Sequence, residues 1–248
     1  MTTSLRNCSR LHIVENQGLF DTFIVIPLHS ISDSFLPIHD RTVPEIPLHK
    51  IMPSAPIMQL IADEKQLHSI TKSILRSDAD YIVMAEARDG IALNIAVKAA
   101  NKGTRRVKIT FHTTDVLDFC YDVADEIVRV YGGSLYSTLL KVAKSFQFIF
   151  HFVQLQDKSK KRLKAIYNIQ SDHSGVSFHK ICQYDLVNHQ WLWKNDLGKR
   201  TREIGMEEDP QCFEKLLLEL SQLSTNFPLQ GETLFFPYQH LRGICYEQ

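Results

Sequence analysis

The chain has 248 residues, of which 44% are hydrophobic, 23% charged and 10% aromatic. These are the values of an ordinary globular protein, so they exclude a disordered, collagen-like or coiled-coil chain. Lysine plus arginine and aspartate plus glutamate both number 28, which gives a formal net charge of zero. No whole-protein field therefore favours a nucleic acid as partner.

The cysteines and the first residues indicate a reducing compartment. The five cysteines are an odd number, lie far apart and form no Cys-x-x-Cys pair, which argues against a disulfide framework or a zinc ribbon. Residues 1–18 lack the apolar core of a signal peptide, and no apolar run approaches the roughly 18 residues of a membrane span. We expect a cytoplasmic globular protein.

Residues 1–56 differ from the rest of the chain in their proline content. Proline removes a backbone donor and keeps the preceding residue extended, so long helices are disfavoured here. The segment contains one apolar run at residues 23–26. We expect one or two short strands and much loop.

Residues 57–200 alternate between strand and helix patterns. The expected elements are a helix in the second half of 57–75, a buried strand at 81–85, a helix at 90–100, a buried strand at 107–111, and a helix from Thr114 or Asp115 to about Tyr131. Strands and helices that alternate with short connections are typical of an α/β domain with a parallel sheet.

From residue 135 onward the pattern predicts an antiparallel meander, which completes the 57–200 domain, and then a helical tail at 201–248. After a helix at 135–144, the expected elements are strands at 146–155, 162–169, 177–184 and 191–193, and an amphipathic helix at 212–223 with Pro210 at its start. We expect the meander to pair with the edge of the parallel sheet.

The first candidate site residue, Glu86, follows the buried run at 81–85. A carboxylate at this place lies at the carboxyl edge of a parallel sheet, where open α/β folds bind ligands. In P-loop nucleotidases an acid at this position orders Mg²⁺ or the attacking water. The alternative is a structural carboxylate that pairs with Arg88.

The second candidate, His112, follows the buried run at 107–111. An imidazole there is near neutral at working pH and could sense a γ-phosphate or position a water. The alternative is a histidine whose ring nitrogens are held by the following helix cap. Adjacent parallel strands would bring His112 near Glu86.

Taken together, these segments resemble the secretion ATPase superfamily of type II and type IV secretion, type IV pili and tight-adherence pili. The Walker B segment of that family is matched by Leu75-Arg76, Asp80, Glu86 and Arg88, and its His box by Thr110-x-His112. The resemblance covers roughly residues 60–170. It implies a partial RecA-like P-loop ATPase core that binds ATP and Mg²⁺, with Glu86, Arg88, His112 and Arg76 as catalytic residues.

Departures from the family pattern limit this inference. Ala85 replaces a glycine, Thr104 a histidine, and no Gly-x-x-x-x-Gly-Lys-Ser/Thr loop occurs anywhere in the chain. Such a loop supplies the amides and the lysine that hold the phosphates. Glu45, in Pro44–Pro47, is a candidate remnant of the family's Asp box, with Glu15 a poorer one. Glu45, Asp80 and Thr110 complete the nucleotide-binding set that the resemblance implies.

We therefore expect a secretion or pilus ATPase module that is truncated and inactive alone. The alternatives are a non-catalytic ring or regulatory partner of such a motor, and a nucleic-acid-binding or regulatory α/β protein with accidental similarity. The family implies a homo-oligomeric ring, a hexamer, docked on a membrane platform protein at the inner face of the cell membrane, with no direct nucleic-acid contact.

One motif stays outside this interpretation. Cationic residues cluster near a predicted hairpin turn: Lys158, Lys160, Lys161, Arg162 and Lys164. They are either a solvated turn or a contact surface for phosphate or a neighbouring subunit.

Overall fold

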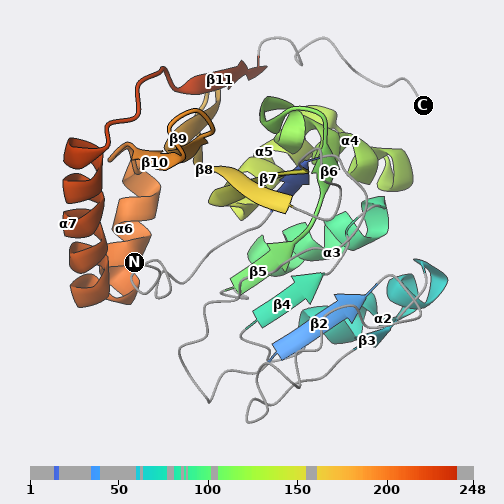
Figure 1. Cartoon of the computed structure of the whole chain (residues 1–248). Coiled ribbons are helices and arrows are strands. Elements are labelled where there is room, and N and C mark those ends of the chain that lie inside the picture. Colours follow the sequence, from blue (N-terminus) through green and yellow to red (C-terminus); the bar gives the residue numbers. More distant parts are fainter. Residues whose placement is uncertain are drawn as a thin grey trace.

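The computed structural model describes residues 14–16, 35–39, 60–61, 64–76, 81–84, 87, 89–101, 106–154 and 161–238. These residues form a mixed α/β fold with two sheets and helices packed against them (Figure 1). The predicted fold class, a parallel sheet with an antiparallel meander and a terminal helix, is confirmed.

The first sheet is parallel throughout. Its strands are β2 (Phe35–His39), β3 (Leu60–Ile61), β4 (Tyr81–Met84) and β5 (Arg106–Ile109), in the order β3-β2-β4-β5. Ile82, Val83 and Met84 are at most 1% exposed, as expected for a parallel strand that is covered on both faces. The run predicted as a strand to residue 111 leaves this sheet after Ile109.

Helices follow the strands along the chain and pack on one another. They are α2 (Glu64–Arg76), α3 (Gly90–Asn101), α4 (Phe119–Tyr131) after a 3-10 turn η1 (Val116–Asp118), and α5 (Leu135–Ser145). Gly132 follows α4 as its carboxyl-terminal cap with a φ of 67°. Glycine favours this left-handed conformation, so Gly132-Gly133 forms the turn that ends the helix. Among the helices of the described residues, none has the length and hydropathy needed to cross a bilayer.

Glycine is required where α3 meets α4. A Cβ atom built on Gly90 would lie 2.2 Å from the carbonyl oxygen of Glu126 and 2.8 Å from Val130. The helix is buried along almost its whole length, from Gly90 to Val97 and again at Ala99. Small side chains therefore let α3 lie between the strands and α4.

The second sheet combines short parallel strands with a long meander. Its strands are β1 (Val14–Asn16), β6 (His112–Thr113), β7 (Phe148–Gln154), β8 (Lys161–Ser171), β9 (Gly175–Asp185), β10 (Gln190–Trp193) and β11 (Leu234–Pro237). The order is β10-β9-β8-β7-β1-β6, and β11 pairs with β9. The meander was expected to pair directly with the parallel sheet. Instead, β1 lies between β7 and β6, and β6 follows β5 along the chain.

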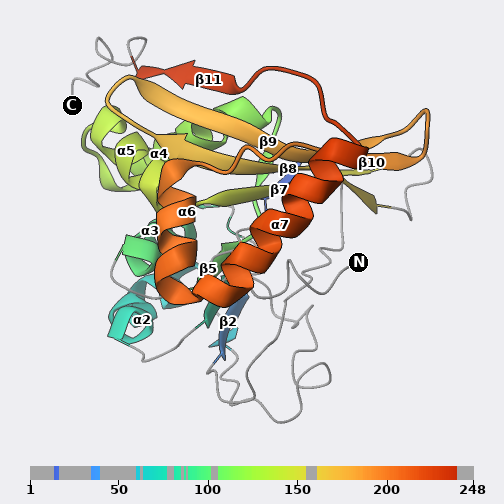
Figure 2. The same cartoon turned by 90° about the vertical axis from the view of Figure 1, so that its left-hand side faces the viewer.

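The carboxyl-terminal part differs from the expected helical tail. Two helices, α6 (Lys199–Glu208) and α7 (Pro210–Asn226), are followed by β11, which returns to the sheet. Helix α6 was not predicted because only Thr201 of its residues is buried, so its sequence has no apolar period; it also crosses the predicted boundary at residue 200. Helix α7 lies across the meander (Figure 2) and packs on Ile181 and Leu197.

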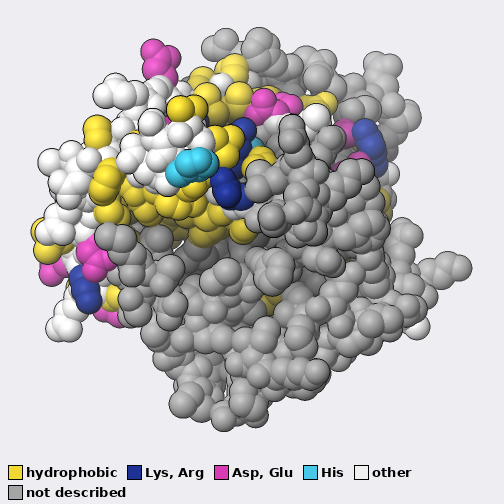
Figure 3. Space-filling model, in the orientation of Figure 1, with side chains coloured by type: hydrophobic (Ala, Val, Ile, Leu, Met, Phe, Trp, Pro, Cys, Tyr) yellow, Lys and Arg dark blue, Asp and Glu magenta, His cyan; other side chains and the backbone are white. Residues whose placement is uncertain are grey.

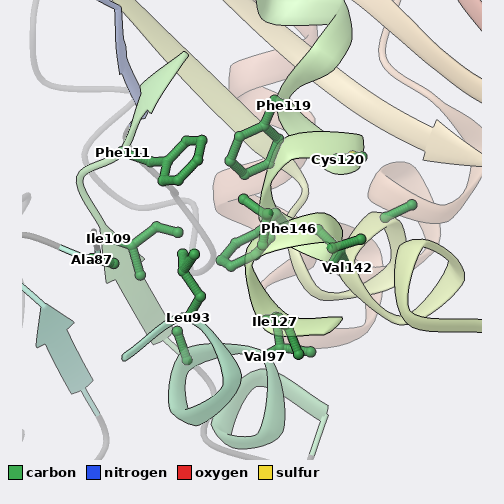
Figure 4. Packing of buried hydrophobic residues seen from close by; sticks show 14 of the residues in the cluster. Ala87, Leu93, Val97, Ile109, Phe111, Phe119, Cys120, Ile127, Val142 and Phe146 are labelled. Atoms are coloured by element: carbon green, nitrogen blue, oxygen red, sulfur yellow. The ribbon is translucent and has the colours of Figure 1, made fainter. Parts of the chain in front are cut away.

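The main core lies between the helices α3, α4, α5 and the strands. Figure 4 shows Phe111 and Phe119 pointing toward one another, with Leu93 and Ile109 below them. The ring centroids of Phe111 and Phe119 are 5.9 Å apart, and those of Phe119 and Phe146 are 5.6 Å apart, both in edge-to-face geometry. Phe111 thus anchors the segment that joins β5 to β6 in the core.

Candidate functional site

The candidate site lies at the carboxyl ends of β4 and β5. These strands are parallel neighbours, and Met84 and Ile109 are register partners at their ends. Beyond them, the Thr110 amide donates to the Met84 carbonyl (3.3 Å), and the Ala87 amide donates to the Thr110 carbonyl (3.0 Å). Thr110 is therefore bonded to both residues that flank Ala85-Glu86 in the sequence.

In the second sheet, strand β1 ends beside β6, the strand that carries His112. It runs parallel to β6, with Glu15 opposite His112 and Asn16 opposite Thr113. Open α/β sheets bind ligands outside the carboxyl ends of their strands.

The helix amino ends at this edge are already capped by aspartates. Asp89 Oδ1 accepts from the amides of Ile91 and Ala92, both at 2.8 Å, at the start of α3. Asp115 Oδ1 accepts from the amide of Leu117 at 3.0 Å, at the start of η1. Sequence analysis placed the start of a helix at Thr114 or Asp115, and Asp115 is the residue that caps the 3-10 turn η1. A carboxylate at each end occupies the place of an anionic ligand.

The buried Thr113 links β6 to α4. Its hydroxyl donates to Asp122 Oδ2 at 2.7 Å, with the Asp115 carbonyl a second acceptor at 2.8 Å. Burial raises the pKa of Asp122, while the Thr113 hydrogen bond lowers it and the charge of Asp118 raises it. This contact fixes the end of β6 relative to the helix that follows it.

A second histidine lies next to β1, on β7. His151 is buried, and Val14 is its register partner. Burial first, and then the charge of Lys164, lower the pKa of His151 to about 4, so that its ring is neutral at physiological pH. Sequence analysis passed over His151 because it lies inside an apolar alternation; its burial becomes visible only when the sheet is assembled.

The structure separates the predicted residues into three groups. Thr110, which is buried, and His112, which is exposed, lie at the edge just described. Arg76 is exposed and ends α2, the helix that leads from the carboxyl end of β3 to the amino end of the parallel β4; it therefore lies at the opposite edge from Thr110. Glu86, Arg88, Asp80 and Glu45 fall outside the described residues, as does the apolar run 23–26.

Two carboxylates were missed by the sequence analysis. Asp89 is the cap of α3, and the signal for it was an aspartate directly before Gly-Ile-Ala at a helix start. Asp40 directly follows β2 in the sequence, the same pattern of acid after strand that singled out Glu86. Asp40, like Glu86 and Glu45, lies outside the described residues.

The described residues do not by themselves form a Mg²⁺ site. In the part of the chain that the structure describes, no group of three or more histidine, cysteine or carboxylate side chains could hold a metal ion. Magnesium is commonly held by one or two carboxylates with phosphate oxygens and waters completing its coordination. The single acid predicted after β4, Glu86, is consistent with that arrangement.

Comparison with known protein families identifies the chain. The family model of the type II/IV secretion system proteins matches residues 58–182, which begin shortly before β3 and end within β9. The chain belongs to this family. The match includes both strands of the candidate site and the first three strands of the meander. A search of curated proteins gives no match.

Solved structures of two ATPases and of a pilus motor are similar to the chain at low identity. The VirB11 ATPase from the Brucella suis type IV secretion system, in complex with sulphate, has 14% identity and a TM-score of 0.48, and the match covers 66% of this chain and 51% of that one. The Legionella pneumophila ATPase DotB has 13% identity and a TM-score of 0.47, covering 88% and 54%. The pilus retraction motor PilT with bound ADP has 14% identity and a TM-score of 0.45, covering 88% and 54%. The chain spans about half the length of these proteins.

Proposed function

We propose that this member of the type II/IV secretion family contributes part of a nucleotide site to a transport or pilus motor. The observation that carries the proposal is the pair of backbone hydrogen bonds from Thr110 to Met84 and Ala87. They tie the strand that leads to His112 to the segment that carries Glu86. An acid and an imidazole at one sheet edge suit the electrostatic work of phosphoryl transfer.

Within this proposal each predicted residue has a role. Glu86 holds Mg²⁺ or its water ligands when MgATP is bound, and Asp40 is the second acid. His112 responds to the nucleotide state, and Arg88 contacts phosphate through its planar guanidinium. Arg76 lies at the other edge of the sheet, so we assign it to the boundary with a neighbouring subunit of the ring.

The chain as given is proposed to hydrolyse ATP slowly or not at all. Phosphoryl transfer depends on positioning the phosphates and neutralising their charge. The sequence after β1, Gln17-Gly18-Leu19-Phe20-Asp21-Thr22, has one glycine and no lysine. The capped starts of α3 and η1 offer no substitute, because their amides are bonded to Asp89 and Asp115.

A second candidate function follows from the missing Gly-x-x-x-x-Gly-Lys-Ser/Thr loop. A subunit without a phosphate cradle could serve as a non-catalytic ring or regulatory partner of an active motor, docked with it on a membrane platform protein. The two functions differ in one measurable property: the first requires MgATP to bind at Glu86, whereas the second requires only assembly with the active subunit.

The test is a coupled ATPase assay and a calorimetric MgATP titration on the purified chain. We expect turnover below about 1 s⁻¹, under the range of ordinary enzymes, and weak binding. A variant with Gly-x-x-x-x-Gly-Lys-Thr grafted after β1 should gain MgATP binding and turnover. Adding Glu86→Gln to the graft should then reduce turnover by at least about 10²-fold.

Three results would decide against the proposal. Turnover of about 1 s⁻¹ or more in the unmodified chain, lost in Glu86→Gln, would mean that another segment holds the phosphates. A grafted chain that folds, binds MgATP and is unaffected by Glu86→Gln would remove Glu86 from the site. His112→Ala in the grafted chain should lower turnover more than ground-state binding; equal loss of both would make His112 a structural residue.

A further inference from the structure

The end of the meander that carries the β9–β10 turn has an unusual surface. The turn exposes two aliphatic side chains, Leu186 at 57% and Val187 at 85%. The same end holds the start of β8 at Lys161, because β8 and β9 are antiparallel. Figure 2 shows the turn projecting from this end, beyond the helices α6 and α7.

The conformation of the turn is fixed by its first residue. Asp185 Oδ1 accepts from the amides of Val187 (2.9 Å) and Asn188 (3.3 Å), and its Oδ2 accepts from the Asn188 side chain (2.6 Å). Hydrogen bonding from Asn188 and Val187 lowers the pKa of Asp185. Because these hydrogen bonds fix the backbone of the turn, the side chains of Leu186 and Val187 are held toward the solvent.

Three aromatic rings lie on the two strands that flank the turn, β9 and β10. Tyr184 and Trp191 are register partners whose ring centroids are 5.4 Å apart, and Trp193 is 6.2 Å from Trp191. All three side chains are half-buried. Tyrosine and tryptophan favour the boundary between an apolar phase and water, because their rings are apolar and carry one polar group.

Cations complete the surface. The Arg162 guanidinium lies 4.6 Å from the centroid of the Tyr184 ring, and Lys164 is exposed at the bulge where β7 and β8 change register. Among the described residues, no carboxylate forms an ion pair with either of them. The side-chain oxygens of the nearby Asp185 accept hydrogen bonds within the turn.

We propose that this end of the meander, the 162–193 surface, docks on a bilayer that contains anionic lipids. Aliphatic side chains stand at the tip, aromatic rings behind them and cations beside the rings. This sequence of layers matches the acyl chains, the interface and the headgroups of such a bilayer. Figure 3, in which this end faces the viewer, shows hydrophobic side chains gathered with lysine or arginine and a histidine over the meander.

A nucleic acid or an acidic protein fits this surface less well. Both would use the cations and the rings, but neither gives a role to an aliphatic pair at the outermost point. Arg162 and Lys164, the two members of the predicted cation cluster whose side chains the structure describes, therefore have a role here.

The experiment measures binding of the full chain to vesicles, without nucleotide, by co-sedimentation. Phosphatidylcholine vesicles with phosphatidylglycerol should bind the chain, and vesicles of phosphatidylcholine alone should bind it much less. The chain has two tryptophans, Trp191 and Trp193, both on β10. Their emission should shift to the blue on binding, and brominated acyl chains should quench it.

Two variants test the two halves of the surface. Leu186→Ser with Val187→Ser should lower the partition coefficient at least about tenfold. Arg162→Gln with Lys164→Gln should lower it about fivefold for each charge removed. The matched controls are Leu218→Ser and Lys215→Gln, which change an exposed leucine and an exposed lysine on α7; both should bind as the unmodified chain does.

Other outcomes would overturn the proposal. These are no binding to anionic vesicles, equal loss in the α7 controls, or an aliphatic variant that binds like the unmodified chain. A cation variant that loses binding to single-stranded DNA and to vesicles alike, with no effect of the aliphatic variant, would mean a general polyanion surface. If a variant fails to fold, tryptophan quenching by brominated lipid in the unmodified chain still decides whether β10 enters the bilayer.

Discussion

Replacing Asn168 with alanine should destabilise the fold more than any surface change in the same sheet. Asn168 lies on β8 and is fully buried, at 0% exposure. Its side-chain nitrogen donates to the Gln147 carbonyl and to the Thr201 hydroxyl, both at 2.8 Å, and its oxygen accepts from the Gly198 amide at 2.8 Å. One amide thus joins β8 to α6 and to the two segments that lead into β7 and α6.

The magnitude follows from which partners lose their bond. The Gln147 carbonyl keeps the Ile169 amide as a donor (2.8 Å), so it is not left unsatisfied. The Gly198 amide and the Thr201 hydroxyl lose this partner in buried positions. Each unsatisfied buried group costs about 1–3 kcal/mol, so the loss of both partners should lower the free energy of unfolding of Asn168→Ala by about 2–6 kcal/mol.

Urea unfolding followed by tryptophan fluorescence measures this loss. Thr201→Val removes one of the three bonds and should cost about 1 kcal/mol, and the double variant should cost less than the sum. Asn188→Ala, which removes an exposed asparagine bonded to Asp185, is the control and should cost under about 1 kcal/mol. A loss below about 1 kcal/mol for Asn168→Ala would refute the reasoning, because the network would then contribute no more than one solvated hydrogen bond.

Three further predictions concern the core. Folding lowers the pKa of His151 from 6.5 to about 4, so its contribution to the free energy of unfolding is complete above about pH 6.5 and is lost as the pH falls toward 4, by at most about 1.4 kcal/mol per pH unit. The His151→Gln variant should therefore show a flatter dependence of Tm on pH in that window, and an unchanged slope would contradict the prediction. Gly90→Ala should cost about 1–3 kcal/mol in thermal unfolding, because the new methyl group meets the Glu126 carbonyl; a neutral effect would mean that α3 and α4 separate easily. Tyr238→Ala should speed alkylation of Cys120, a buried thiol whose pKa is raised by burial, as followed by mass spectrometry, and an unchanged rate would show that Tyr238 does not cover it.

The elements that the sequence predicted are those whose own residues decide them. The strand at β4 is specified by Ile82, Val83 and Met84, and the start of α7 by Pro210, whose preceding Asp209 accepts from the Cys212 amide at 3.0 Å. These features depend on local composition and capping, which a single sequence displays.

The elements that were missed depend on partners far away in the chain. Strand β1 is Val-Glu-Asn, with one apolar residue, and it is a strand because β6 and β7 pair with both of its edges. Strand β11 is held by β9 and by Tyr238, whose amide donates to the Ser174 carbonyl at 3.0 Å. For the candidate site, the sequence predicted that the ends of β4 and β5 meet and offered Asp115 as a cap, but it did not identify Asp89 as the cap of α3.

The place of β1 has a consequence for how the chain folds during synthesis. Residues 14–16 are synthesised before their partners at 112–113 and 151–152, which follow about a hundred or more positions later. At roughly 5–20 residues per second, β1 waits on the order of ten seconds for both neighbours. Closing so long a loop is slow, so β7 to β10 pair with one another first and β1 inserts late. The sheet therefore passes through a stage in which β6 and β7 present open edges to the nascent chain's surroundings.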